Sequence, residues 1–405
     1  MKSKRPLCSI VIVALMLVAS FSAFASILPS FPVNSPQKAQ ISSYAPHAPI
    51  FFSDNAGFLG SNSSTGVSWG SGTVDDPYII EGWGIDTASG GGISISYTDV
   101  HFIIRDCYVH DVAPTRSGIY LHSSANGILI NNNCSSNQNG IYLDSSSNNT
   151  LINNTCSNNK RGISIHESSN NTLINNTCWN NYDGIYIYES SNNTVWNNTC
   201  NYNKLTGIHL GVSSNNTINW NNCSRNWDDG IGMWGCYGNV VYQNVVISNI
   251  DYGIDIPQGS RNRIWNNTFI GNNGATDTYN ASHVQAYDNG NNNWWNSTNG
   301  YGNYWSDWTK PDNNAPYGRV DSPYNIDDGY RLDSKDGYDG HSKAKDYYPL
   351  TAPRISDPPY IPAPSDMLIP ILAIAVVIIV AVILVSFIVL RKRKGETAEP
   401  PSVNQ

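Results

Sequence analysis

The sequence predicts an all-β chain that folds as a right-handed parallel β-helix, a solenoid of 22- or 23-residue coils, followed by one C-terminal transmembrane helix. A Gly-Ile pair returns at steps of 22, 22, 22, 23, 23 and 23 residues. The glycines of these pairs are Gly118, Gly140, Gly162, Gly184, Gly207, Gly230 and Gly253. A fixed period of this length is the signature of a repeat protein.

Apolar and polar residues alternate after each glycine, as in Gly162-Ile163-Ser164-Ile165. This alternation predicts strands with one buried face. The Asn-rich turns between the strands are too short for a crossover helix, so successive turns of the chain must stack in parallel. Leucine-rich repeats have a similar period, but their Leu-x-x-Leu-x-Leu frame is missing here. We therefore expect β-helix coils over residues 65–285.

Composition and charge limit the function. Only 13% of the 405 residues are charged, and the formal net charge is -8. Strong helix formers are scarce, which argues against a helical bundle. A chain with negative net charge is a poor match for nucleic acid, so we expect no nucleic-acid partner.

The two ends of the chain predict export and anchoring in the cell membrane. Residues 1–25 have a basic start, an apolar stretch and an Ala-Phe-Ala site, which is typical of a signal peptide, and residues 26–64 form a lead-in segment. Residues 351–366 are a Pro-rich stalk, and residues 367–390 form an uncharged stretch long enough to span a bilayer. The basic start of residues 391–405 predicts a cytoplasmic tail, with the N-terminal domain outside the cell.

Two columns of asparagine recur once per coil. The first contains Asn132, Asn154, Asn176, Asn198, Asn221 and Asn267, and the second contains Asn137, Asn159, Asn181, Asn203, Asn226 and Asn272. Asparagine tolerates the left-handed conformation of tight corners, and stacked amides can hydrogen-bond along the solenoid axis. We expect both columns to lie at corners and to be structural.

A column of cysteines recurs in the same way, five residues after the first apolar residue of each coil. Counted from Phe102 onward, it contains Cys107, Cys134, Cys156, Cys178, Cys200 and Cys223, and then Val245 and Phe269. Because apolar residues continue the series, the column is expected to point inward. A ladder of reduced, buried thiols is favoured, because stacked neighbours lie slightly wide of disulfide geometry. Strained disulfides and a soft-metal thiolate site are the alternatives.

The repeat frame NNTLINNTCSNNKRGISI resembles the NosD-type β-helix repeats, also called the carbohydrate-binding and sugar-hydrolase (CASH) class. GSGTVDDPYIIEGWGID at residues 70–86 is similar to the first segment of that family. GNYWSDW, SPYNI and DYYPL, at residues 302–308, 322–326 and 346–350, are similar to its closing segment. The resemblance covers residues 65–350 and implies a β-helix.

For function the resemblance leaves three alternatives open. The family includes exported bacterial and archaeal surface proteins, sugar hydrolases, and a copper-binding accessory of nitrous oxide reductase maturation. The predicted membrane anchor favours an archaeal-type surface protein that binds polysaccharide or forms part of the cell envelope. A carbohydrate-active hydrolase or lyase is the second interpretation, and copper handling is the least favoured.

Residues two and four positions after each glycine should face outward on neighbouring strands. This face is a candidate ligand-binding strip made of Tyr120, His122, Tyr142, Asp144, His166, Tyr186, Tyr188 and His209. Aromatic faces stack on sugar rings, although tyrosine is also simply common in exposed strands. A copper or zinc site at His122, Asp144 and His166 is an alternative, but the two histidines would lie roughly 10 Å apart, two strand spacings, which is too far for one ion.

Paired carboxylates on adjacent coils are the candidate catalytic residues if the protein is an enzyme. They are Asp228, Asp229, Asp251 and Asp255, with Glu167 stacked on Glu189 as a second pair. Glycosidases use two carboxylates at such spacing. Of the motifs of polygalacturonases, however, only the Asp-Asp-Gly at residues 228–230 is present. Binding without catalysis is therefore favoured.

Residues 286–350 are expected to cap the last coil, because an uncovered solenoid end exposes a sticky edge. Their aromatic residues include Trp294, Trp295, Tyr301, Tyr304, Trp305 and Trp308. Asp333, Asp336 and Asp339 in DSKDGYDG offer oxygen ligands for calcium, although the EF-hand pattern is missing.

Thirteen Asn-x-Ser/Thr sequons predict glycosylation outside the cell, although many arise from the repeat itself. They begin at Asn62, Asn133, Asn148, Asn153, Asn170, Asn175, Asn192, Asn197, Asn215, Asn222, Asn266, Asn280 and Asn296.

Overall fold

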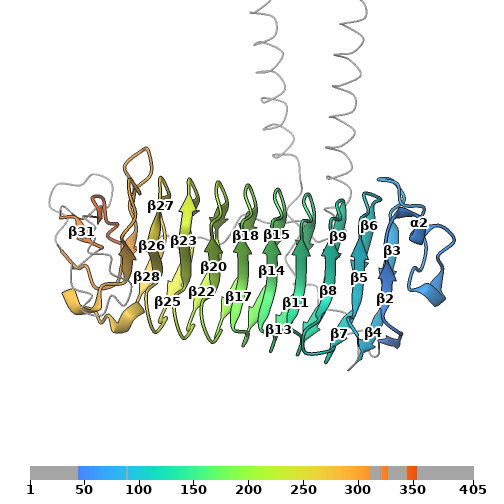
Figure 1. Cartoon of the computed structure of the whole chain (residues 1–405). Helices are drawn as coiled ribbons and strands as arrows, with labels where there is room; N and C mark the ends of the chain where they lie inside the picture. Colours follow the sequence, from blue (N-terminus) through green and yellow to red (C-terminus); the bar gives the residue numbers. More distant parts are fainter. Residues whose placement is uncertain (1–43, 88–89, 311–319, 321, 327–343, 354–405) are drawn as a thin grey trace, which may run out of the picture. The chain divides into compact units, whose positions relative to one another are not determined.

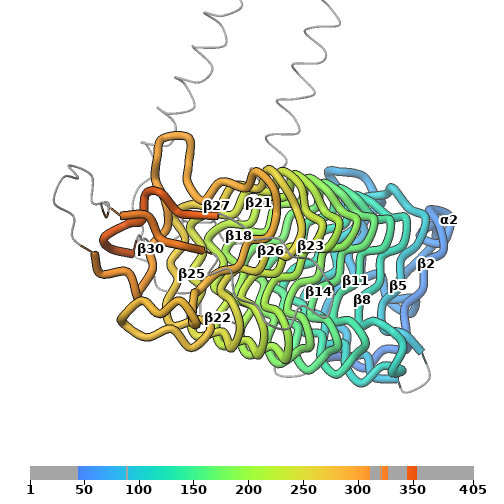
Figure 2. Tube along the Cα trace, turned by 60° about the vertical axis from the view of Figure 1, so that its left-hand side comes forward, coloured from blue at the N-terminus to red at the C-terminus, as the bar shows by residue number. Residues whose placement is uncertain are grey.

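The computed structural model of the chain describes residues 44–87, 90–310, 320, 322–326 and 344–353. Strands dominate these residues and wind into coils that stack along one axis (Figure 1). The strands form three parallel sheets, which we call A, B and C. Each coil contributes one strand to sheet B, then one to sheet C and then one to sheet A. Figure 2 shows the successive coils nested on one another. The predicted solenoid is confirmed over the described residues.

Several predicted segments lie outside the described residues. They are the signal peptide, residues 354–366 of the stalk, the transmembrane helix at residues 367–390, the tail, and the calcium loop with Asp333, Asp336 and Asp339. Among the residues that are described, no helix is both long enough and apolar enough to cross a membrane.

Sheet A has 11 strands. They are β1 (Ala45–Pro46), β4 (Trp83–Asp86), β7 (Tyr108–His110), β10 (Asn133–Ser135), β13 (Thr155–Ser157), β16 (Thr177–Trp179), β19 (Thr199–Asn201), β22 (Asn222–Ser224), β25 (Val245–Ile247), β28 (Thr268–Ile270) and β30 (Tyr304–Trp305). Sheet C has 9 strands. They are β3 (Tyr78–Glu81), β6 (Phe102–Arg105), β9 (Gly127–Ile130), β12 (Thr150–Ile152), β15 (Thr172–Ile174), β18 (Thr194–Trp196), β21 (Thr217–Asn219), β24 (Val240–Tyr242) and β27 (Arg263–Trp265).

Sheet B has 10 strands and carries the Gly-Ile repeat. They are β2 (Ile50–Phe52), β5 (Ile93–Ser96), β8 (Ser117–His122), β11 (Asn139–Asp144), β14 (Arg161–His166), β17 (Asp183–Tyr188), β20 (Ile208–Gly211), β23 (Ile231–Tyr237), β26 (Ile254–Ser260) and β29 (Ala286–Asp288). Ile163 pairs with Ile141 on one side and with Ile185 on the other, so the predicted register is confirmed. Glycine precedes each isoleucine because backbones approach closely: a Cβ at Gly162 would lie 2.5 Å from the carbonyl oxygen of Gly184.

Both predicted asparagine columns are buried hydrogen-bond ladders. The Asn176 Oδ1 accepts from the backbone N–H and the Nδ2 of Asn154 at 3.0 and 2.9 Å. Its Nδ2 donates to the carbonyl oxygen of Leu151 at 3.0 Å and to the Oδ1 of Asn198 at 2.9 Å. Each amide thus satisfies polar groups of the coils on either side. The two ladders also contain Asn244, Asn249 and Asn303.

The left-handed corner residue is the one before each ladder asparagine. Asn153 and Asn158 have φ angles of 55° and 58°. Asn154 and Asn159 instead point into the solenoid and are buried. The corner prediction was therefore wrong by one residue, because an amide that bridges two coils must face the interior.

A third asparagine ladder, between sheets B and C, was not predicted. It contains Asn149, Asn171, Asn193, Asn216, Asn239 and Asn262. The hydroxyls of Ser146, Ser168 and Ser190 beside it accept backbone N–H groups in the same manner. Every corner of a coil is thus fixed by side chains that repeat.

The cysteine column holds five residues on successive coils of sheet A. Cys134, Cys156, Cys178, Cys200 and Cys223 are fully buried and carry free thiols. The thiols of Cys156, Cys178 and Cys200 form hydrogen bonds with the thiols of the coils before and after them. Val246, and not Val245 as expected, continues the column.

Cys107 does not belong to this column, so that assignment was wrong. Its backbone N–H donates to the Asn132 Oδ1 at 3.1 Å, which places Cys107 at the end of an asparagine ladder. The column position in its coil is Val109, which pairs with Cys134. The count failed because it started two residues too early in β6.

Aromatic residues cover both ends of the solenoid. Phe58, in the short helix α2 (Asn55–Phe58), stacks on Phe52 with ring centroids 4.1 Å apart. At the other end Trp305 stacks on Phe269 at 4.3 Å. Trp295 and Trp305 are buried there, whereas Trp294 is exposed. The remaining described elements are the 3-10 helices η1 (Ser63–Thr65), η2 (Asn272–Gly274) and η3 (Ala281–His283) and the antiparallel pair β31 (Tyr324–Asn325) and β32 (Lys345–Asp346).

Candidate functional site

Parallel pairing aligns the outward residues of sheet B in three columns. The tyrosine column contains Tyr120, Tyr142, Ser164, Tyr186 and His209. The histidine column contains His122, Asp144, His166 and Tyr188. The arginine column contains Ser117, Asn139, Arg161 and Asp183. The structure thus brings the predicted strip residues together on one face.

The rings of the tyrosine column stack on one another. The ring centroids of Tyr120 and Tyr142 are 5.3 Å apart, and those of Tyr186 and His209 are 5.2 Å apart. Arg161 fills the gap between the two pairs, with its guanidinium carbon 3.6 Å from the centroid of the Tyr186 ring. Because the ring faces contact one another, the rings do not form the flat stacking surface that we expected. They present their edges to a ligand instead.

Asp144 is the centre of a hydrogen-bond network in the histidine column. The Tyr120 hydroxyl donates to Asp144 at 2.9 Å, and the Nδ1 atoms of His122 and His166 lie 3.0 and 3.4 Å from its oxygens. Burial opposes ionisation of Asp144, but hydrogen bonds from these three partners outweigh it and lower the pKa of the carboxyl. Asp144 is therefore an ionised anchor that fixes three neighbouring side chains.

A groove of about 500 Å³ lies beside the tyrosine column. Tyr120 and Tyr142 line it, together with Phe51, Gly90, Gly91, Gly92, Ile93, Ser94, Thr115, Arg116, Ser117 and Asn139. Aromatic, hydroxyl, amide and guanidinium groups therefore meet in one place. A volume of this size is typical of small-ligand sites, which span about 300–1,000 Å³.

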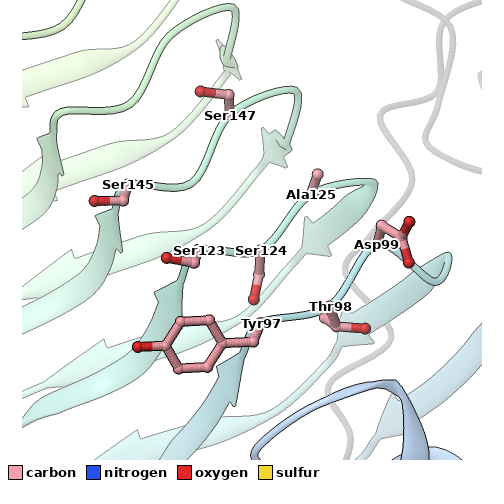
Figure 3. A pocket seen from close by; sticks show the side chains of 8 residues that line it. All are labelled: Tyr97, Thr98, Asp99, Ser123, Ser124, Ala125, Ser145 and Ser147. Atoms are coloured by element: carbon pink, nitrogen blue, oxygen red, sulfur yellow. The ribbon is translucent and has the colours of Figure 1, made fainter.

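A second hollow, of about 490 Å³, lies on the other side of the Asp144 network. Figure 3 shows its oxygen-bearing side chains on successive turns, with Ser123 and Ser124 on one turn and Ser145 and Ser147 on the next. The Tyr97 hydroxyl lies 3.0 Å from the His122 Nε2 and links this hollow to the histidine column. Thr98, Asp99 and Ala125 complete the lining.

Three of the four predicted catalytic acids form a cluster near the far end of the strip. Oxygen atoms of Asp228, Asp229 and Asp251 all lie within 4.8 Å of one another. Burial raises the pKa of the Asp229 carboxyl, and the negative charges of Asp255, Asp228 and Asp251 raise it further. The cluster can therefore keep one protonated carboxyl beside ionised ones.

Two family models match this chain. Residues 76–222 match the model described as periplasmic copper-binding protein (NosD), and residues 168–314 match the one described as right handed beta helix region. The second model describes a β-helix, which agrees with the three parallel sheets of the structure. The chain is a right-handed parallel β-helix protein. Among curated proteins, none matches it by sequence.

Solved structures with partial likeness to this β-helix include polysaccharide-acting enzymes. The A-module of mannuronan C-5 epimerase AlgE6 from Azotobacter vinelandii is 15% identical, with a TM-score of 0.40, over 53% of this chain and 73% of that chain. Pectate lyase Pel9A is 14% identical, with a TM-score of 0.39, over 57% and 66%. A variant of the periplasmic alginate epimerase AlgG is 15% identical, with a TM-score of 0.38, over 61% and 84%. Likeness of this degree assigns no activity to the β-helix.

The β-helix does not form the alternative metal site at His122, Asp144 and His166. Both histidines direct Nδ1 at Asp144, but the His122 Nε2 faces the Tyr97 hydroxyl and the His166 Nε2 lies 3.9 Å from a Glu167 oxygen. The three side chains therefore do not converge on one point. The thiols of the cysteine column, the soft-metal alternative, are fully buried and form hydrogen bonds with one another.

The sequon asparagines occupy two columns and several isolated positions of the β-helix. Asn148, Asn170, Asn192 and Asn215 are exposed at left-handed corners. Asn153, Asn175, Asn197 and Asn266 have the same conformation but are half-buried. Asn133 and Asn222 lie in strands, and Asn62, Asn280 and Asn296 lie outside the repeat frame.

Sequence reasoning missed the groove. Its far wall comes from Phe51 and Arg116, which lie outside the repeat, and no periodic signal marks them. Asn139 could have been found from the repeat. It lies directly before a Gly-Ile pair, as do Arg161 and Asp183, with which it forms the arginine column.

Proposed function

We propose that this protein binds polysaccharide in the groove beside the tyrosine column. The observation that carries the proposal is the groove itself, in which Tyr120 and Tyr142 face polar groups such as Asn139 and Arg116. Sugars need hydrogen-bond donors and acceptors close to an apolar surface, and such a lining provides both. Because strands β8 and β11 hold Tyr120, Tyr142 and Asn139, these side chains need little ordering when a ligand binds.

The Asp144 network supports the proposal by orienting the groove wall. The Tyr120 hydroxyl is held by Asp144 at 2.9 Å, so its ring cannot turn away from the groove without losing a charge-assisted hydrogen bond.

A glycan array with the full-length protein tests the proposal, followed by calorimetry with any glycan that is retained. Tyr142→Ala should weaken binding at least about tenfold, which corresponds to about 1.4 kcal/mol. Tyr186→Ala is the matched control, because Tyr186 belongs to the same column but does not line the groove. Equal losses in both variants, or no retained glycan, would contradict the groove as the site.

A carbohydrate-active hydrolase or lyase is the second candidate, and the Asp228–Asp229–Asp251 cluster favours it. A protonated carboxyl with a raised pKa beside a carboxylate is the pairing that glycosidases use, and a retaining enzyme holds the two groups about 5–5.5 Å apart. A reducing-sugar assay on the glycans that bind would detect turnover. Asp229→Asn should abolish that turnover and leave glycan affinity unchanged.

We further propose that the protein is held at the cell surface by residues 367–390, with the β-helix outside as part of the envelope. The support is the sequence of the two ends of the chain. Cell fractionation followed by protease treatment of intact cells tests this location. The full chain should sediment with membranes and lose its β-helix to external protease, and a chain ending before residue 367 should be released.

A further inference from the structure

A second polar cluster lies where the histidine column meets the turns toward sheet C. His166, Glu167 and Glu189 each offer one ligand atom, and these atoms all lie within 4.8 Å of one another. Glu167 follows His166, the last residue of β14, and Glu189 follows Tyr188, the last residue of β17. His166 and Tyr188 pair with one another. Their side chains therefore leave the solenoid one above the other.

Contacts from outside the cluster orient its ligand atoms. The His166 Nδ1 faces Asp144 at 3.4 Å, which turns the Nε2 toward Glu167, 3.9 Å away. The Tyr188 hydroxyl forms a hydrogen bond with Glu189. Metal-ligating histidines almost always have their second ring nitrogen held in this way, by a carboxylate or a carbonyl oxygen. The arrangement thus leaves one imidazole nitrogen and two carboxylates directed toward one place.

The charge of the cluster is unbalanced. Over the part of the chain that the structure describes, no Lys or Arg forms an ion pair with Glu167 or Glu189. Asp144 adds a third carboxylate behind His166. Carboxylates one coil apart, about 4.8 Å, repel each other, and a bound cation would remove this repulsion.

We propose that His166, Glu167 and Glu189 bind one divalent transition-metal ion, with Zn²⁺ as the representative. One imidazole and two carboxylates, with water in the fourth position, form a donor set that Zn²⁺ accepts. Zn–ligand distances of about 2.0–2.2 Å place tetrahedral ligand atoms about 3.4 Å apart, so the exposed glutamates need to close by about 1 Å. The set lacks the thiolate and thioether ligands that Cu(I) prefers.

Equilibrium dialysis of the full-length protein, without a histidine tag, tests the site with Zn²⁺ alone. We expect one strongly bound Zn²⁺ per chain. Glu189→Gln and Glu167→Gln should each weaken its binding at least about tenfold, because each removes a charged ligand without changing side-chain shape. Asp144→Asn should weaken it about 10- to 100-fold through the orientation of His166.

The Asp228–Asp229–Asp251 cluster provides the matched control. Its ligands are all oxygen, so Asp228→Asn should leave Zn²⁺ binding unchanged. The proposal is overturned if Asp228→Asn weakens the binding as much as Glu189→Gln does, or if no Zn²⁺ binds below millimolar concentration. Circular dichroism of each variant without metal checks that the solenoid is intact. Should one glutamate variant fail to fold, the other still decides.

Discussion

The inner and outer faces of sheet B belong to the same strands but follow different rules. Ile163 has isoleucine above and below it, whereas its neighbour Ser164 has tyrosine above and below. Inside, a side chain must fit its equivalent on the next coil, because no other group can reach the space. Outside, a neighbouring column can fill a gap, as Arg161 does over Tyr186. Repetition is therefore a requirement of the interior, and the outer face is free to carry a binding site.

The largest difference between interior and exterior side chains of the solenoid should appear at an asparagine ladder. Asn176→Ala removes four hydrogen bonds and leaves buried polar groups of Asn154 and Leu151 without their partner. Since each unsatisfied buried group costs about 1–3 kcal/mol, we expect the free energy of unfolding to fall by roughly 4 kcal/mol. Urea denaturation followed by circular dichroism measures it.

Thr177→Ala is the control for this comparison. Thr177 directly follows Asn176 at the start of β16, but its side chain is only half-buried. The free energy of unfolding should fall by less than about 1 kcal/mol in this variant. Similar losses for both variants would show that the ladder amides contribute no more than surface side chains.

The second prediction concerns Asp183, a charged residue of the arginine column that is buried although it faces outward. Burial raises the pKa of its carboxyl to about 6, although the charge of Arg161 opposes the shift. The folded chain therefore holds a proton between about pH 4 and pH 6 that the unfolded chain has released. The free energy of unfolding falls by about 3 kcal/mol as the pH rises through this window.

Asp183→Asn should remove this dependence. The difference in unfolding free energy between the variant and the parent chain should grow in favour of the variant from pH 4 to pH 6, and then stay constant. Urea denaturation at four pH values measures that difference. Because both chains contain the other titratable groups, their contributions to the pH dependence cancel in this difference. One such group is His209, whose burial lowers its pKa to about 4, so that its contribution to the free energy of unfolding rises with pH. A difference that does not change with pH would show that Asp183 ionises normally.

The same contrast explains how much could be predicted from the sequence. The fold, the Gly-Ile register and the two asparagine ladders repeat, so their period reveals them. The groove does not repeat: Arg116 lies in a connection before β8, and Phe51 lies near the N-terminal end. Cys107 was misplaced for a related reason, because its coil departs from the common length. Periodicity reports what every coil shares, whereas a site is made where coils differ.

The smallest effect should come from the cysteine column, because its role is to fill space. Cys178→Val should change the free energy of unfolding by less than about 1 kcal/mol, since Val109 and Val246 already occupy the column on other coils. Cys178→Ser should cost about 1–3 kcal/mol, because it places a hydroxyl in the buried thiol ladder. Urea denaturation compares the two variants.

Thiol counting in the unfolded protein tests the same column without mutation. All seven cysteines of the described residues carry free thiols, so a thiol reagent should label each of them. Only three labelled thiols among these seven would show that the column is bridged, because two bridges use four of its five cysteines and leave Cys107 and Cys236 free. In that case Cys178→Val would also cost far more than 1 kcal/mol, because removing a disulfide typically costs about 2–5 kcal/mol. The two measurements must therefore agree, and together they decide whether the interior repeats cysteine for its volume or for its chemistry.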